Sequence, residues 1–247
     1  MKKPLFKVLC VLCMVILCSF AFVGCEGDGP KTPGGSSDGG TGGGNAAPTS
    51  FSVTCDEDDV FGDYYDLHSN YLKVGAGETV TVTVESWDFL SVKKVFANNT
   101  ECTSASGKFT FTMPGENVVV TAEFDVVSIP ETADGLKWVD KNPQLEAGSV
   151  LNTSLKVDFG DNPILNSVSA NDEGYTTMLY AKVISTNQNV IPSDAIRRIE
   201  PIVGSNGAYA VGAYVSIDAT KISRGETTLI FIDTDNDRAI TIDVTVN

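Results

Sequence analysis

Alternation of apolar and polar residues over most of the chain is the feature that most restricts its fold. From residue 51 onward, Thr/Val-rich runs are bounded by glycine, asparagine and aspartate. A period of two places alternate side chains on one face of a strand, and no window of helical length has a sustained apolar stripe at helical spacing. The sequence therefore predicts an all-β fold of two small tandem domains. The clearest predicted strands are Thr79–Glu85, Lys108–Thr112, Val118–Phe124, Thr176–Ser185, Ala208–Ile217, Thr227–Ile232 and Ala239–Val246.

The first 25 residues have a different character. Three lysines accompany an apolar run of 16 residues, Val8–Val23, which is shorter than the about 20 helical residues that cross a bilayer core. We therefore expect residues 1–24 to be a signal peptide; a general secretory signal or an uncleaved anchor is the alternative. The segment ends in Phe22-Val23-Gly24-Cys25, which resembles the lipobox of bacterial lipoproteins. The resemblance implies that Cys25 is lipidated and holds the protein at a membrane of the bacterial cell envelope.

A glycine-rich stretch follows the proposed lipid site. Residues 26–50 contain nine glycines and three prolines, so residues 25–50 are expected to be a flexible tether with a reach of roughly 25–30 Å. Removing residues 1–24 takes away three lysines and no acid, which leaves 14 basic and 32 acidic residues and a net charge of −18. We expect no nucleic-acid partner, because no basic tract could neutralise phosphates. The lipid, rather than a basic patch, must then provide the membrane contact.

Residues 51–126 form the first predicted β-domain. A strand opens with GAGETVTVTV at Gly75, and KFTFTMPGENVVVTAEF covers residues 108–124. The period of two places Phe109, Phe111 and Met113 on one face, and the Pro-Gly pair after them predicts a hairpin turn. This pattern resembles the divergent InlB B-repeat family of bacterial surface proteins, in which such a hairpin closes the repeat. The resemblance implies a spacer or an interaction module.

Residues 127–247 form the second predicted domain. They end in SRGETTLIFID, Ser223–Asp233, followed by RAITIDVTV, Arg238–Val246. This stretch is similar to the last two strands of bacterial Ig-like domains. The resemblance implies an Ig-like β-sandwich.

Two cysteines, Cys55 and Cys102, remain once the signal segment and Cys25 are set aside. An even pair in an exported protein predicts a disulfide, which would close a loop of ~50 residues and stabilise the fold by a few kcal/mol. The alternative is two buried free thiols. Two cysteines and a single histidine do not make a zinc site, and the sequence predicts no metal and no cofactor.

Two acidic segments are candidate binding sites. Asp233–Asp237 spaces three carboxylates two apart, like the start of a calcium loop, but Arg238 occupies the position that needs glycine, so a hairpin tip is predicted. The second segment is expected to be a solvated acidic edge with aromatic residues partly in the core; a surface that holds a sugar or a cation is the alternative. Its members are Asp56, Glu57, Asp58, Asp59, Asp63 and Asp66, beside Phe61, Tyr64, Tyr65, His68 and Tyr71.

The sequence contains no recognisable catalytic motif. His68 is the only histidine, and no nucleophile elbow or phosphate loop is present, so we expect no enzymatic activity. The predicted function is a lipid-anchored envelope or surface protein that displays β-domains for adhesion or protein–protein interaction. The alternative is a carbohydrate-binding surface lipoprotein that captures glycan through exposed aromatics such as Tyr64, Tyr65 or Trp138. Trp87 and Trp138 are otherwise expected to be core anchors.

Overall fold

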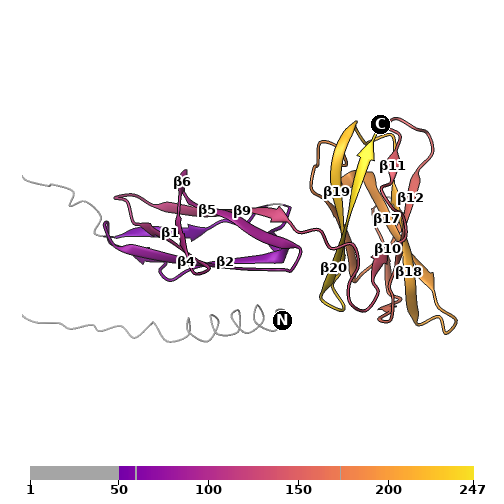
Figure 1. Ribbon diagram of the computed structural model, residues 1–247, viewed down its shortest axis with the longest axis horizontal. Helices are drawn as coiled ribbons and strands as arrows, with labels where there is room; N and C mark the ends of the chain where they lie inside the picture. Colours follow the sequence, from indigo (N-terminus) through magenta and orange to yellow (C-terminus); the bar gives the residue numbers. More distant parts are fainter. Residues whose placement is uncertain (1–49, 59, 173) are drawn as a thin grey trace, which may run out of the picture. The chain divides into compact units, whose positions relative to one another are not determined.

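A computed structural model describes residues 50–58, 60–172 and 174–247. The predicted signal peptide of residues 1–24, the lipid site at Cys25 and most of the predicted tether lie outside the described residues. The described part is all β apart from two short 3-10 helices, as the alternating pattern predicts, and it forms tandem sandwiches (Figure 1). Within these ranges, no sheet combines strands from before and after residue 127, and no helix is long and apolar enough to cross a membrane.

The N-terminal sandwich has two sheets, with strand orders β3-β1-β9-β5-β6 and β2-β4-β8-β7. Strand β1 pairs with β9 in parallel, and the other neighbours in these sheets are antiparallel. The elements are β1 (Phe51–Cys55), the 3-10 helix η1 (Gly62–Tyr64), β2 (Tyr65–Ser69), β3 (Lys73–Val74), β4 (Thr79–Ser86), β5 (Leu90–Ala97), β6 (Thr100–Glu101), β7 (Thr103–Ala105), β8 (Lys108–Thr112) and β9 (Val118–Val126).

The predicted hairpin between β8 and β9 is wrong. Strand β8 pairs with β4 and β7, whereas β9 pairs with β1 and β5, so the Pro-Gly connection crosses from one sheet to the other. Phe109 and Met113 from β8 and its end pack in the same core as Val118 and Val120 from β9. The period of two identifies the buried face of each strand, but it does not distinguish a hairpin from a crossover between two facing sheets.

The C-terminal sandwich also has two main sheets. One contains β10-β12-β18, with β13 and β17 both paired to β18, and the other has the order β11-β20-β19-β16 with β11 parallel to β20. The elements are β10 (Lys137–Trp138), β11 (Gln144–Leu145), β12 (Thr153–Asp158), β13 (Ile164–Leu165), β14 (Val168–Ala170), β15 (Thr176–Met178), β16 (Ala181–Ser185), the 3-10 helix η2 (Ser193–Ala195), β17 (Ile196–Val203), β18 (Tyr209–Ile217), β19 (Gly225–Asp233) and β20 (Arg238–Val246).

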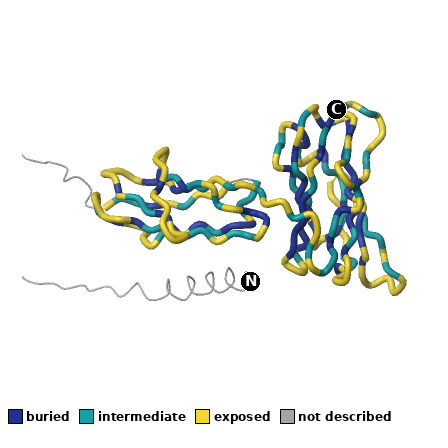
Figure 2. Tube along the Cα trace, in the orientation of Figure 1, coloured by how far each residue is buried: buried dark blue, intermediate teal, exposed yellow. Residues whose placement is uncertain are grey.

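Each sandwich buries the apolar side of its alternating strands (Figure 2). In the N-terminal sandwich Val80 and Val82 of β4 are fully buried. In the C-terminal sandwich Val215 and Phe231, from the two facing sheets, lie in one core cluster. The predicted strand Thr176–Ser185 is interrupted at two exposed residues, which separate β15 from β16. The described residues all belong to one compact unit, Ala46–Asn247.

Candidate binding surface

Strand β18 turns two tyrosines outward on one face. Tyr209 and Tyr214 are 43% and 42% exposed, whereas Ala210 and Ala213 between them are fully buried. Two residues five positions apart in a regular strand point to opposite faces. The pairing of β18 with β17 skips Val211, which makes that residue a β-bulge. The bulge returns Tyr214 to the face that Tyr209 occupies.

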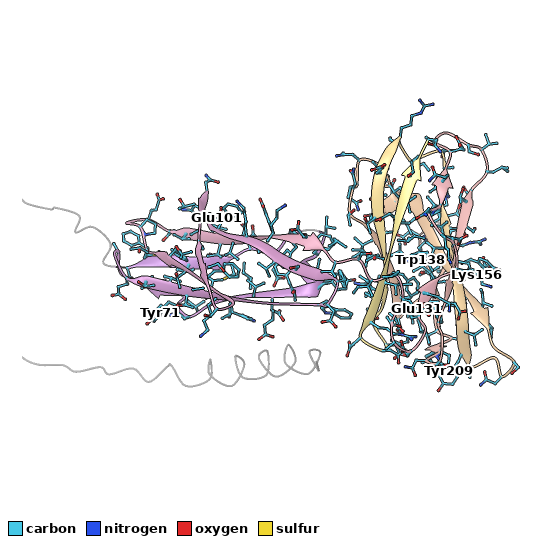
Figure 3. The ribbon with its side chains drawn as sticks, viewed as in Figure 1. Tyr71, Glu101, Glu131, Trp138, Lys156 and Tyr209 are labelled. Atoms are coloured by element: carbon cyan, nitrogen blue, oxygen red, sulfur yellow. The ribbon has the colours of Figure 1, made fainter. Side chains whose placement is uncertain are left out.

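Charged side chains flank the ring of Tyr214. Its register partners are Glu200 on β17 and Lys156 on β12. Arg198, two positions before Glu200 and therefore on the same face, forms an ion pair with it at 3.2 Å. Figure 3 shows Lys156 and Tyr209 toward the outside of the C-terminal sandwich. The exposed ring is thus bordered by hydrogen-bond donors and acceptors.

Two aliphatic side chains extend this surface. Leu165 of β13 is the register partner of Tyr209, and Val211 lies two positions after Tyr209 in β18 and therefore on the same face. They are 39% and 46% exposed. Contiguous exposed apolar side chains mark interaction sites more often than scattered ones do. We call this surface the β18 strip and define it as Leu165, Tyr209, Val211 and Tyr214.

The aromatic residues that the sequence suggests as sugar-binding residues are buried. Tyr64, Tyr65 and Trp138 are only 3–6% exposed. The Tyr64 ring packs edge-on against Trp87 with centroids 5.6 Å apart, and burial raises the pKa of its hydroxyl. Trp138 contacts Phe231 edge-on at 6.1 Å in the C-terminal core. These residues are core anchors, as expected for the tryptophans, and the expectation that Tyr64, Tyr65 or Trp138 is exposed to bind glycan is wrong.

The acidic segment before β2 is engaged in local structure. A carboxylate oxygen of Asp58 accepts hydrogen bonds from the backbone amides of Val60 and Phe61 at 2.7 and 2.6 Å. The hydroxyl of Tyr65 accepts the amide of Asp58 at 2.7 Å. Across the described ranges, no group of three or more His, Cys, Asp or Glu side chains is placed to hold a metal ion.

The segment Asp233–Asp237 is the tip of the β19–β20 hairpin, as predicted. Asp233 is fully buried and accepts the backbone amides of Asp235 and Asn236. Arg238, its register partner, donates from Nε to Asp233 at 2.6 Å. The arginine takes the place that a calcium ion would need beside this carboxylate.

The guanidinium of Arg238 also reaches the segment that precedes β10. It donates to Asp134 at 2.8 Å and to the backbone carbonyls of Phe159 and Asn162. Asp134 is bound in turn by the side chains of Thr132 and Asn162. The Thr132 hydroxyl, the Asn162 amide and the Arg238 charge outweigh partial desolvation and lower the pKa of Asp134 to about 2. This buried network joins the hairpin tip to the opposite sheet of the sandwich.

Cys55 and Cys102 are both free thiols in the structure. Cys55 ends β1, and Cys102 follows β6 with its amide bonded to the carbonyl of Val95 on β5. Strands β9 and β5 separate the two positions, so they are roughly 14 Å apart at ~4.8 Å per strand. A disulfide needs Cα atoms about 4.4–6.8 Å apart. The predicted disulfide is therefore not formed, and burial raises the pKa of both thiols.

A pocket of about 520 Å³ lies beside β15, β16 and β17 and contains the side chains of Arg197 and Arg198. Arg197 pairs with the buried carboxylate of Asp218 and stacks on Tyr175, with the guanidinium 5.1 Å from the ring centroid. Arg198 faces Glu200. Because both arginines already neutralise carboxylates, the pocket is a poor anion site.

His68, the only candidate catalytic base of its type, is exposed on β2 opposite Thr83. The neighbouring strand thus presents a threonine side chain and backbone at this position. The position does not suggest a buried catalytic centre.

Comparison with known proteins adds no relative. No protein-family model matches the chain, and no curated protein matches it. The candidate surface therefore depends on the geometry of the β18 strip alone.

Sequence reasoning missed Tyr209 and Tyr214 as candidates. Their spacing of five suggests opposite faces, and only the bulge at Val211 places them together. The one signal in the sequence is the set of small residues between them, Ala210, Gly212 and Ala213, which is unusual for the centre of a strand.

Proposed function

We propose that the protein is a lipid-anchored protein of the bacterial cell envelope, whose tandem β-domains bind a macromolecule for adhesion or protein assembly and carry out no catalysis. The observation that carries the proposal is the β18 strip. Four apolar side chains, each at least 39% exposed, lie on two adjacent strands. A contiguous exposed apolar patch on a protein whose mature charge is −18 indicates a binding surface, because exposed apolar area is unfavourable in water.

The order of segments supports the anchoring part of the proposal. A lipobox-like Cys25, a glycine-rich tether and two folded domains follow one another in the sequence. The C-terminal sandwich has strand orders β10-β12-β18-β17 and β11-β20-β19-β16, which correspond to the two sheets of immunoglobulin-type sandwiches. This correspondence supports the Ig-like resemblance.

Anchoring is tested by Cys25→Ser in cells fed a labelled fatty acid. We expect the unchanged protein to incorporate the label and to sediment with membranes, and Cys25→Ser to lose both properties. Retention of the label in Cys25→Ser would contradict the lipid site.

Binding through the β18 strip is tested by photo-cross-linking in whole cells. Tyr214 is replaced by p-benzoylphenylalanine in one variant and Tyr71, which is 45% exposed in the N-terminal sandwich, in a matched control. We expect adducts of increased mass from position 214 only. Equal adducts from both positions, or none from position 214, would refute the proposed surface.

A further inference from the structure

The size of the β18 strip restricts what can bind to it. Four side chains that are each about two-fifths exposed offer on the order of 300 Å² of surface. A stable protein–protein interface buries about 800 Å² on each partner. The strip is therefore too small to hold a second copy of the chain or another globular protein by itself, and its size suits a slender ligand.

The strip is elongated along β18. Tyr209 and Tyr214 are separated by four steps of the ladder once the bulge is subtracted, or roughly 13 Å at ~3.3 Å per residue. Between them Val211 presents an exposed aliphatic side chain, whereas Gly212 is buried, and a Cβ there would lie 2.6 Å from the carbonyl oxygen of Val157. A ligand that spans both rings would therefore also cross the exposed side chain of Val211.

The chemistry of the surface suits a polyhydroxylated ligand. Tyrosine rings offer flat apolar faces and a hydroxyl that donates and accepts hydrogen bonds. Lys156 and Glu200 beside Tyr214 supply a donor and an acceptor on the same face. A pyranose ring has apolar C–H faces and equatorial hydroxyls. Its faces can therefore stack on the tyrosine ring while its hydroxyls form hydrogen bonds with the lysine and glutamate beside that ring.

The local charges favour a neutral ligand. Lys156 and Arg198 are balanced on this face by Glu200 and Asp158, and the rest of the mature protein is strongly acidic. An anionic polymer would meet a repulsive field and no unbalanced basic cluster.

We propose that the β18 strip binds a neutral polysaccharide, whose sugar rings stack on Tyr209 and Tyr214 and whose hydroxyls bond to Lys156 and Glu200. This inference rests on the proposed binding role of the same surface and names its ligand class. Because the two rings are roughly 13 Å apart, an oligosaccharide long enough to cover both binds more tightly than a monosaccharide.

The test is affinity electrophoresis of residues 46–247, which form the compact unit that contains both cores. Gels contain starch, dextran, hydroxyethylcellulose or galactomannan, with polygalacturonate as the anionic comparison. We expect at least one neutral polymer to retard the protein. Tyr209→Ala and Tyr214→Ala should each weaken that retardation at least tenfold, whereas the equally exposed Tyr71→Ala should leave it unchanged. Circular dichroism checks that each variant is folded.

Three results would overturn the inference: no retardation by any neutral polymer, retardation by polygalacturonate alone, or equal weakening by Tyr71→Ala. Photo-cross-linking from position 214 separates this failure from failure of the proposed function. Adducts to a protein, together with no retardation by any neutral polymer, would refute polysaccharide binding and leave the proposed binding role intact. Absence of any adduct and of any retardation would refute both.

Discussion

Replacement of Arg238 by methionine should strongly destabilise the C-terminal sandwich. The arginine side chain is 7% exposed and its partner Asp233 is 0% exposed, so Arg238→Met keeps the volume of the stem but leaves a carboxylate buried without its cation. Breaking a buried ion pair by removal of one partner costs about 3–5 kcal/mol. With a urea dependence of about 1–3 kcal/mol/M for a domain of this size, the unfolding midpoint should fall by roughly 2 M.

Urea unfolding followed by tryptophan fluorescence measures this loss in one domain. Trp138 lies in the C-terminal core and Trp87 packs against the N-terminal core, so Trp87→Phe leaves a signal from the C-terminal sandwich alone. The matched control is Lys93→Met, which removes an ion pair with Asp125 whose side chains are 52% and 63% exposed; it should cost less than about 1 kcal/mol.

A second substitution tests the cause. Asp233→Asn added to Arg238→Met removes the stranded charge but keeps an oxygen that can accept the turn amides. We expect it to recover at least half of the lost stability. A loss below about 1 kcal/mol for Arg238→Met, or no recovery in the double variant, would refute the assignment of this network as a buried electrostatic link.

Three further outcomes are expected for residues 46–247. Titration with a thiol reagent in denaturant, without reductant, should count two thiols, Cys55 and Cys102; a count of zero would establish the disulfide after all. Because the pKa of Asp134 is lowered to about 2 in the folded protein, against about 3.9 when unfolded, its contribution to stability is present above pH 4 and disappears as the pH falls through 2. Urea midpoints measured from pH 5 to pH 2 should therefore fall less in Asp134→Asn than in the unchanged protein. An equal fall of the midpoint in both proteins would contradict this. Gly160→Ala should cost about 2 kcal/mol or more in urea unfolding, because φ is +61° and a Cβ would lie 2.2 Å from the carbonyl oxygen of Asp134; Gly207→Ala, at φ +73° with open space around it, should cost less, and equal costs would refute the steric argument.

Strands with a strict period were predictable from the sequence, and short or irregular ones were not. The TVTVTVE run gives β4 and the FTFT run gives β8, because Val80 and Val82 in β4 and Phe109 in β8 are buried while the residues on either side of each are not. Strands β10, β11 and β13 have two residues each, too few to show any period. They are strands because a neighbouring backbone pairs with them, a non-local cause that no short window contains.

The candidate surface escaped sequence reasoning for a similar reason. The faces of Tyr209 and Tyr214 depend on one extra residue in β18, and the register with β17 determines where that residue is accommodated. Conversely, Tyr64 and Tyr65 adjoin an acidic run that suggests exposure, but tertiary packing buries both. Composition indicates how polar a segment is, whereas burial depends on which sheet the chain reaches.

The parallel pairing of β1 with β9 has a mechanical consequence. A load between a lipid at Cys25 and a ligand on the C-terminal sandwich would enter the N-terminal sandwich at Phe51 and leave it at Val126. Because these strands run in the same direction, the load pulls them in opposite directions along their length and strains their registered hydrogen bonds together in shear. An antiparallel pair held at the same ends of its strands would instead separate one bond at a time. The N-terminal sandwich is therefore connected so as to resist extension while the protein holds its ligand.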